Sequence, residues 1–406
     1  MPKPAALPSI LILAGTYLVL ALGRLPGFRV DRTGAAIIGA TLMVAVNALT
    51  LPEAVEAINT DTILLLFGMM IVVANLRLSG IFALITQWVV RHAHRPLVLL
   101  AAVVGISGVF SAFFVNDTMC LVLTPLVLEI TTHLRRNPIP YLLALAMASN
   151  IGSVATVTGN PQNTLIGSLS GIHYRAFAAA LAPVALVGLA AVVGIIAVTY
   201  RAEFLTAAPR VVLEAAPVRI HRALAWKSAV ASVCMIVLFF AGWPISKVAL
   251  VTGALLLVTR RVKPERVYAE IDWSLIVLFI GLFIVVRGVE KTSLSAELQV
   301  IASRLHLERT SVMSAFAAVL SNIVSNVPAV LVFRPFIPHL PDPRRAWLTL
   351  AMSSTLAGNL TVLGSVANLI VSQRARHQVK ITFWEYARVG APLALLTIAF
   401  GIVLLV

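Results

Sequence analysis

The sequence predicts an all-α polytopic membrane protein made of two inverted repeats, and three observations lead to this fold class. Hydrophobic residues form 60% of the 406 residues and charged residues only 12%, against about 25% charged residues in a soluble domain. Apolar segments of about 17–25 residues, the length that crosses a bilayer, recur along the chain. Two of them are interrupted by small polar residues at corresponding places in two halves, which predicts a binding site near the middle of the membrane.

The composition also excludes several classes of function. The net charge of +15 would suggest nucleic-acid binding in a soluble chain, but the basic residues lie mostly in loops beside apolar segments, so no nucleic-acid partner is expected. Cys120 and Cys234 both lie in apolar segments, where we expect packing residues rather than a disulfide or metal pair. The chain has no Walker A sequence, His-Glu-x-x-His motif or nucleophile triad. We therefore predict neither catalysis nor ATP-driven transport, and no cofactor beyond a coupling ion.

The N-terminal repeat, residues 1–202, is expected to hold five transmembrane helices and one re-entrant hairpin. The expected spans are Ser9–Gly23, Thr33–Leu51, Thr62–Leu78, the interrupted helix Tyr141–Ser170, and Ala176–Tyr200. Ser79–His94 carries its apolar residues on one helical face, which predicts an amphipathic helix in the membrane interface.

Two apolar arms, Pro96–Phe114 and Thr118–Leu134, surround the polar tip Val115-Asn116-Asp117-Thr118. Hydropathy alone would make each arm a full span. We interpret the pair as a re-entrant hairpin, because its connection is too tight for two full spans. The buried Asn-Asp pair also needs a cavity.

The C-terminal repeat, residues 223–406, follows a cytoplasmic linker at residues 203–222. Its expected spans are Ala223–Gly242, Ile245–Thr259, Trp273–Val289, the interrupted helix Arg345–Val371, and Phe383–Val406. A second amphipathic stretch is expected at Ser293–Leu305. A second hairpin is expected from the arms Thr310–Val324 and Ala329–Leu340 around the tip Ser325-Asn326-Val327-Pro328.

The repeat is visible in the residues themselves. The corresponding segments are Phe67–Met70 and Ile280–Phe283, the tips at Asn116 and Asn326, the breaks at Gly159 and Gly364, and Ala182–Leu186 and Ala391–Leu395. Five spans per half is an odd number, so the second half must cross the membrane in the opposite direction. The Lys and Arg residues of segments 24–32, 77–95, 135–136, 201–222, 260–266 and 374–380 favour the cytoplasmic side. Both termini are then expected on the non-cytoplasmic side of the plasma (inner) membrane.

The two tips and the two breaks are expected to meet at one substrate and ion site. A broken helix exposes an amide end, which attracts anions, and a carbonyl end, which together with Asn and Ser side chains can ligate Na⁺. The candidate site residues are Asn116, Asp117, Thr118, Ser149, Asn150, Thr158, Gly159, Asn160, Asn163, Ser325, Asn326, Gly364, Ser365 and Asn368. The candidate Na⁺ ligands among them are Asn116, Gly159, Asn326 and Gly364.

Asp117 is the candidate coupling residue. A carboxylate at membrane depth is costly and marks a functional position. It would act either as a proton carrier or as a ligand for a cation. The alternative is that Asp117 only caps the following hairpin arm. Val327 occupies the matching place in the second tip, so the site is expected to be asymmetric.

These motifs carry a resemblance to a known superfamily. They are Asn116-Asp117-Thr118 with Leu123-Thr124-Pro125, Ser149-Asn150-Ile151-Gly152 with Gly159-Asn160-Pro161-Gln162-Asn163, and the segment Leu320–Pro328. Across nearly its whole length the chain resembles the ion transporter superfamily, in its ArsB/NhaD branch and its citrate-transporter-like permeases. The resemblance implies a scaffold domain and a mobile transport domain, each drawn from both repeats. It also implies a homodimer and elevator-like alternating access.

The sequence departs from parts of that superfamily. Its divalent-anion members carry Ser-Asn-Thr at both tips, where this chain has Val115-Asn116-Asp117 and Ser325-Asn326-Val327. The Asn-Asp tip looks closer to the arsenite-pump relatives, although Gly159–Asn163 differs from their expected Gly-Asp-Pro-Pro-Asn. The function that we expect is secondary active transport of a small inorganic or organic anion, coupled to H⁺ or Na⁺. The alternatives are Na⁺/H⁺ antiport, arsenite efflux and, more remotely, an ion channel.

Overall fold

The computed structural model describes residues 6–406 except 26, 94, 206–220, 261 and 292–303. In this part of the chain, six helices are long and apolar enough to cross a membrane. They are α4 (Thr60–Ser79), α6 (Pro96–Phe113), α10 (Tyr174–Thr199), α12 (Arg222–Phe240), α15 (Trp273–Glu290) and α21 (Phe383–Leu405). The shorter apolar helices are α1 (Ala6–Leu22), α2 (Arg32–Ala45), α8 (Pro138–Val154), α13 (Ile245–Leu257) and α17 (Thr310–Val324).

The other helices are shorter or more polar and lie between these. They are α3 (Leu51–Glu56), α5 (Ile81–His92), α7 (Asn116–His133), α9 (Pro161–Ser170), α11 (Arg201–Leu205), α14 (Pro264–Tyr268), α18 (Asn326–Phe333), α19 (Pro343–Leu356) and α20 (Val366–Ala375), with 3₁₀ turns at Ile337–His339 and Ala357–Asn359. Polar side chains begin many of the helices: the carboxylate of Asp31, for example, accepts a hydrogen bond from Gly34 N at 2.8 Å. Such caps satisfy amides that have no partner inside the helix.

Two glycines at corresponding places in the repeats bring helices into close contact. A Cβ atom on Gly68 would lie 2.6 Å from the backbone of Ala249, so α4 and α13 pack backbone to backbone. A Cβ atom on Gly281 would lie 2.8 Å from the backbone of Ala36, so α15 packs closely against α2. Small residues allow such close packing between helices in a membrane. The Phe67–Met70 and Ile280–Phe283 correspondence is thus matched by an equivalent helix contact.

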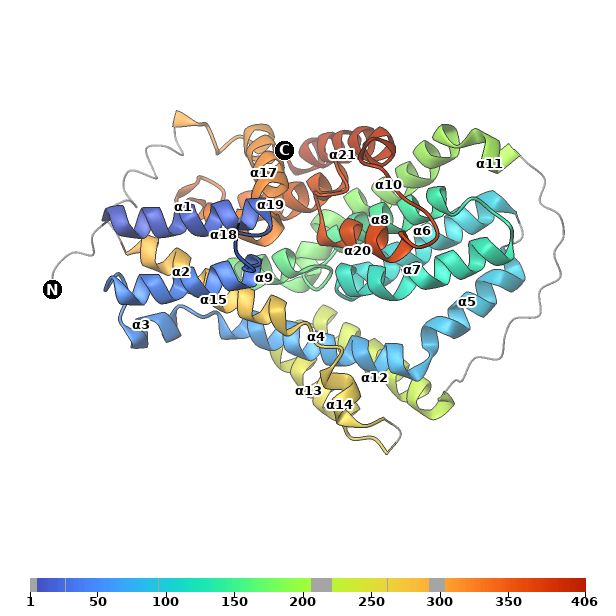
Figure 1. Cartoon of the computed structure of the whole chain (residues 1–406), viewed down its shortest axis with the longest axis horizontal. Coiled ribbons are helices and arrows are strands. Elements are labelled where there is room, and N and C mark those ends of the chain that lie inside the picture. Colours follow the sequence, from blue (N-terminus) through green and yellow to red (C-terminus); the bar gives the residue numbers. More distant parts are fainter. Residues whose placement is uncertain (1–5, 26, 94, 206–220, 261, 292–303) are drawn as a thin grey trace.

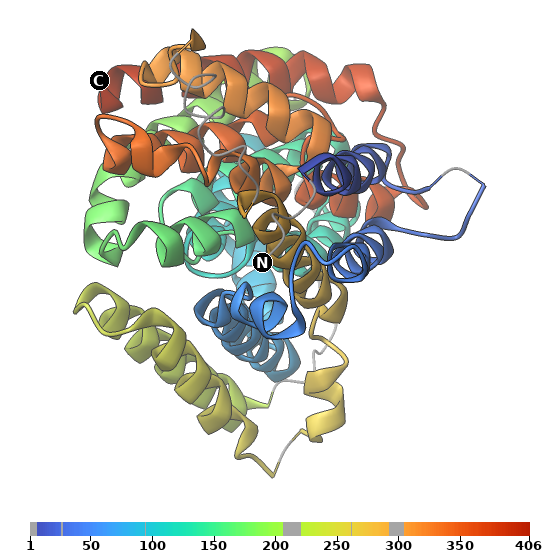
Figure 2. The ribbon, with the colours of Figure 1, turned by 90° about the vertical axis from the view of Figure 1, so that its left-hand side faces the viewer.

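The helices form two groups that pack mainly among themselves. We call α1, α2, α4, α12, α13 and α15 the frame helices, and α6–α10 with α17–α21 the site helices. Figure 2 shows α12 and α13 along the lower edge beside α4, with the C-terminal site helices at the top. In Figure 1 the helices of the first predicted hairpin, α6 and α7, lie in the right half, while α17 and α18 lie toward the left. Their tips therefore approach the middle of the molecule from opposite ends.

Both predicted helix interruptions are present. α8 ends at Val154 and α9 begins at Pro161, while α19 ends at Leu356 and α20 begins at Val366. The expected helix at Ser79–His94 is α5. Most of the linker 203–222 and of the stretch Ser293–Leu305 lies outside the described residues.

Two predicted helices were too long. The span Thr33–Leu51 ends at Ala45, where Asn47 takes a positive φ of 60° and turns the chain toward α3. The arm Ala329–Leu340 is wrong in both of its bounds, because α18 runs from Asn326 to Phe333. Pro335 explains the early end, since proline has no amide proton with which to continue the helix hydrogen bonds.

Candidate functional site

A cavity of about 180 Å³ lies where the two tips and the two breaks converge. Its lining residues include Asn116, Asp117, Pro161, Gln162, Ser325, Asn326, Val327, Ser365 and Val366. These residues belong to the first turns of α7, α9, α18 and α20 or to the positions just before them. Four helix N-termini therefore face one small space. Unpaired amides and the helix dipole make each N-terminus attractive to negative charge.

The first break is held open by side-chain hydrogen bonds to its own backbone. Nδ2 of Asn163 donates to the carbonyl oxygens of Ser153 at 3.1 Å and Thr156 at 3.0 Å. The Gly159 carbonyl oxygen accepts from the backbone amide of Asn116 at 3.0 Å, which attaches the first tip to the break. These bonds replace the helix hydrogen bonds that the break removes, as buried backbone requires.

The second break repeats this arrangement. Nδ2 of Asn368 donates to the carbonyl oxygens of Gly358 at 2.7 Å and Thr361 at 3.0 Å. Asn368, Gly358 and Thr361 each lie 205 residues after their counterparts in the first break (368 − 163 = 205). The two breaks therefore use the same asparagine in the same way, although the second has no proline corresponding to Pro161.

Asn150 joins the two breaks and the first tip. The side chain is 1% exposed. Its Nδ2 donates to Oδ1 of Asn359 at 2.8 Å and of Asn368 at 2.9 Å. Its Oδ1 accepts from Nδ2 of Asn116 at 3.1 Å and from the Ser365 hydroxyl at 3.0 Å. One buried amide thus fills its hydrogen-bonding capacity with partners from the first tip and the second break.

A second polar link crosses between the repeats. Asn160 caps α9 through its Oδ1, and its Nδ2 donates to the Thr355 hydroxyl at 3.3 Å. Gln162 donates to the same hydroxyl at 3.0 Å. Since Thr355 corresponds to Asn150 and Asn160 to Ser365, the Asn160–Thr355 bond is the counterpart of the Ser365–Asn150 bond.

The two tips differ in their contacts. The Ser149 hydroxyl donates to the carbonyl oxygen of Asn116 at 3.2 Å, while Oδ1 of Asn116 is buried without a hydrogen-bond partner. In the second tip, Oδ1 of Asn326 accepts from the Ser321 hydroxyl at 2.6 Å. Ser325 has φ 79° and ψ 161°, a conformation that glycine adopts easily and other residues adopt only under strain. The strain and the unpaired oxygen both lie at the cavity wall, where functional sites concentrate such features.

Asp117 lines the cavity and is half-buried. The backbone amide of Ala367 at the start of α20 lies beside its carboxylate, and Asp272 is close enough to repel it. Val327 lines the cavity from the second tip, so one side carries a carboxylate and the other an apolar group. The predicted asymmetry of the site is therefore present in the geometry.

Arg32 and Asp272 also line the cavity and were not among the predicted site residues. Arg32 donates through Nε to the carbonyl oxygen of Leu20 at 3.1 Å, and Asp272 caps α15 by accepting from Leu275 N at 3.0 Å. Both belong to the frame helices, so the cavity lies at the boundary between the two groups. Arg32 lies in one of the basic loop segments of the sequence, and nothing in the sequence relates either residue to the tips.

The predicted residues thus divide into three sets. Asn116, Asp117, Ser325, Asn326 and Ser365 line the cavity. A supporting layer behind them is formed by Ser149, Asn150, Gly159, Asn160, Asn163, Gly364 and Asn368. Thr118 and Thr158 are not brought to the cavity wall. The Thr158 hydroxyl instead contacts the Tyr174 hydroxyl at 2.9 Å.

We expect Gly159→Ala to collapse the first break. The added Cβ atom would overlap the backbone carbonyl oxygen of Ser153, which Asn163 holds in place. Relieving this overlap should cost about 1–3 kcal/mol of unfolding free energy or more. The melting temperature and the transport rate of the purified protein would both fall. The control is Gly105→Ala in α6, where a Cβ meets nothing within 4 Å and should stabilise the helix by up to ~1 kcal/mol. Equal stability of the two variants would contradict the predicted overlap.

Comparison with known proteins places this chain among transporters. Residues 17–357 match the family described as citrate transporter (CitMHS). The silicon efflux transporter LSI3 of Oryza sativa subsp. japonica is 28% identical over 477 residues, which cover 99% of this chain and 98% of that protein. A protein of Mycobacterium tuberculosis named as an uncharacterized transporter is 30% identical over 421 residues, which cover 98% of this chain and 97% of that protein. The putative transporter arsB of Dictyostelium discoideum is 24% identical in an alignment that covers 93% of this chain and 87% of that protein.

The fold is similar to a solved transporter structure. The crystal structure of the Alcanivorax borkumensis YdaH transporter matches with a TM-score of 0.62 at 16% identity and covers 100% of this chain and 97% of that one. The family and the named relatives are transporters, in line with the expectation that the chain is not an enzyme. With its apolar helices and a family match over most of its length, the chain belongs to the citrate transporter family of multi-pass membrane transporters.

Proposed function

We propose that the protein is a secondary active transporter that moves a small anion across the plasma membrane, coupled to H⁺ or Na⁺. The observation that carries this proposal is the convergence of four helix N-termini on one cavity of about 180 Å³. Each N-terminus contributes about half a positive charge, so together they provide roughly +2 at the cavity. The space suits an inorganic oxyanion or a small organic acid rather than a bulky ligand.

The charged side chains around the cavity supply a reason for ion coupling. Arg32 adds one positive charge, while Asp117 and Asp272 together add two negative charges. When one of the two carboxylates is protonated, the charge around the cavity becomes one unit more positive. Protonation of Asp117 therefore favours the bound anion, and the two binding events are linked.

A sodium–proton exchanger is a second candidate, and one observation favours it. The unpaired Oδ1 of Asn116 lies next to the carboxylate of Asp117 in the sequence and at the same cavity. An amide oxygen and a carboxylate are suitable ligands for Na⁺, with the Gly159 carbonyl close behind. In this case the cation itself would occupy the site, and a proton would displace it.

The arrangement of the helices supports inverted repeats with two re-entrant hairpins. The tips at Asn116 and Asn326 approach the cavity from opposite ends of the molecule (Figure 1). α6 is long enough to cross a membrane by its length alone. The polar tip that follows it nevertheless lies at the central cavity, which favours re-entry over a full crossing.

We further propose that the site helices move as a transport domain against the frame helices as a scaffold. The cavity opens beside Arg32 and Asp272, which lie at the end that the charge pattern assigns to the cytoplasm. Toward the opposite end, Arg334 after α18 pairs with Glu290 of α15 at 3.3 Å. At the cavity wall, the Tyr17 hydroxyl donates to the Pro328 carbonyl oxygen at 3.0 Å. The ion pair would close the outer side of an inward-facing state, and both contacts would have to break for alternating access.

Reconstitution tests this function. The full chain in proteoliposomes should take up a suitable anion with saturable kinetics that require a proton or sodium gradient. The panel contains the anions phosphate, sulfate and citrate, together with arsenite and silicic acid, which are neutral hydroxides at neutral pH. Silicic acid is included because one relative is named as a silicon efflux transporter. Sodium flux driven by a pH gradient, without any anion, would favour the exchanger. Non-saturating flux that needs no gradient would overturn both and indicate a channel.

A further inference from the structure

A second and larger hollow lies away from the central cavity. It encloses about 600 Å³ between the turn after α9, the start of α10, the turn after α12 and the first turn of α19. The turn after α12 belongs to the frame, and the other three segments belong to the site helices, so the cleft lies across the boundary between the two groups. At its floor the Tyr174 ring packs against the rings of Phe239 at 5.3 Å and Phe240 at 5.1 Å.

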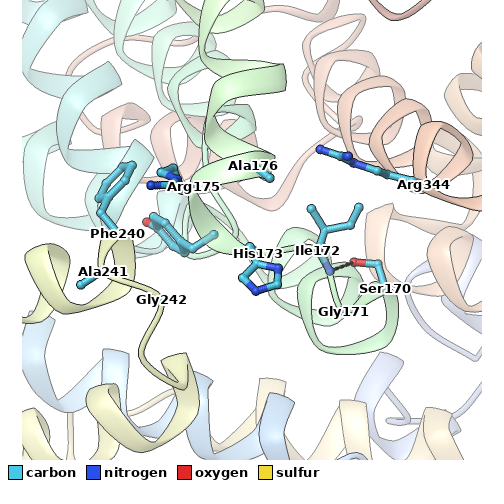
Figure 3. A pocket seen from close by; sticks show the side chains of 11 residues that line it. Ser170, Gly171, Ile172, His173, Arg175, Ala176, Phe240, Ala241, Gly242 and Arg344 are labelled. Atoms are coloured by element: carbon cyan, nitrogen blue, oxygen red, sulfur yellow. Dashed lines mark hydrogen bonds between the residues drawn. The ribbon is translucent and has the colours of Figure 1, made fainter.

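The charged residues that line this cleft are all basic. Of the eleven described residues that line it, His173, Arg175 and Arg344 are basic and none is acidic. Figure 3 shows Arg344 extending toward the space above Ile172, with Arg175 and His173 on the other side. Asp342, the nearest acidic residue in the chain, pairs with Arg345 at 3.7 Å instead.

The two arginines are available to a ligand. Arg175 and Arg344 are both exposed, and no ion pair is recorded for either one among the described residues. They come from different helices and face one hollow from two sides. The first turn of α10 adds backbone amides, because His173 at its start makes no side-chain cap. Guanidinium groups and helix-end amides are the donors that bind phosphate-type oxygens.

We propose that this cleft is a second anion site, which binds a phosphate-type oxyanion between Arg175 and Arg344. The oxyanion comes either from solution or from the head group of an anionic lipid. Tyr174 connects the cleft to the central site, since its hydroxyl contacts Thr158 of the first break at 2.9 Å. An oxyanion bound here bridges two of the site helices, α10 and α19, beside the turn after α12 of the frame.

Thermal unfolding of the full-length protein in neutral detergent, titrated with inorganic phosphate at constant ionic strength, tests the proposal. The wild-type melting temperature should rise saturably. Arg175→Gln/Arg344→Gln should weaken the apparent phosphate affinity at least about tenfold, as expected for the loss of two charge-assisted contacts. The matched control Lys247→Gln/Arg304→Gln removes the same charge from exposed positions outside the cleft and should titrate like the wild type.

Two further experiments distinguish a lipid head group from a free oxyanion, and binding at the cleft from binding at the central cavity. In nanodiscs, a higher melting temperature with phosphatidylglycerol than with phosphatidylcholine, lost only in the arginine double variant, would identify a lipid head group. Asn326→Ala alters the central cavity and should leave the cleft response unchanged, so failure of the proposed transport function would not affect this result. If the double variant misfolds, Arg344→Gln alone should partly reduce the rise of the melting temperature with phosphate. A double variant that responds like the wild type in both arms, or a wild type that responds in neither, overturns the proposal.

Discussion

Asp117→Asn is expected to abolish ion-coupled transport while leaving the fold intact. The carboxylate lies at the cavity, beside the start of α20 and near Asp272, and the described structure records no ion pair for it. Asparagine has the same shape and keeps hydrogen-bonding capacity, so the packing around α7 should be preserved. What is lost is the ability to bind a proton or a cation. We expect gradient-driven uptake to fall by about 100-fold, the scale of strong coupling between two sites.

Uptake in proteoliposomes at a series of external pH values measures this effect. The wild-type rate should vary with pH, and the residual rate of Asp117→Asn should be flat. The matched control is Glu129→Gln, which removes a carboxylate from the same helix but outside the cavity, where Glu129 is half-exposed and faces His133. If uptake by Asp117→Asn still depends on the ion gradient as in the wild type, Asp117 is not the coupling residue. Asp272 would then be the candidate, and Asp272→Asn the next variant to measure.

The breaks and tips could be predicted because their chemistry is local. Gly159 and Gly364 approach backbone or side-chain oxygens too closely for a Cβ atom, and Asn163 and Asn368 bond to carbonyls seven and ten residues before them. A sequence repeat preserves such short-range geometry residue by residue. A spacing of 205 residues relates the two breaks, including the second one, which lacks a proline, and a spacing of 210 residues relates the two tips (326 − 116 = 210).

Contacts between distant segments could not be predicted. Asn359 and Thr355 complete the hydrogen-bond network, yet each is an ordinary polar residue near the end of a helix. Arg32 and Asp272 reach the cavity because the frame helices pack beside it. Thr158 shows the opposite failure: it lies in the break, but the backbone turns its hydroxyl toward Tyr174. Side-chain direction within an irregular segment depends on the tertiary structure, and hydropathy and spacing contain no information about it.

Asn150→Ala is expected to separate the two breaks and to give the largest loss of stability among the polar substitutions of the site. The substitution removes the four hydrogen bonds of a side chain that is 1% exposed. Each partner then loses a hydrogen bond in a buried environment; the partners are the side chains of Asn116, Asn359, Ser365 and Asn368. Each unsatisfied group costs about 1–3 kcal/mol, so the total loss is at least about 4 kcal/mol if only part of the network reorganises. Transport should be lost as well, because Asn116 and Ser365 both line the cavity.

Asn75→Ala provides the matched control, since Asn75 is also buried but donates only to Ile71 of its own helix, and its Oδ1 has no partner. Thermal unfolding should show a small change for Asn75→Ala and a fall of many degrees for Asn150→Ala. Asn150→Asp keeps the shape and the acceptor but loses both donors to Asn359 and Asn368, and it should destabilise the protein comparably. If Asn150→Ala unfolds like Asn75→Ala, the amide does not join the repeats, and the second break must be held by Asn368 and its carbonyl partners alone. That outcome would leave each break self-supporting, so the site helices would no longer be expected to move as one unit.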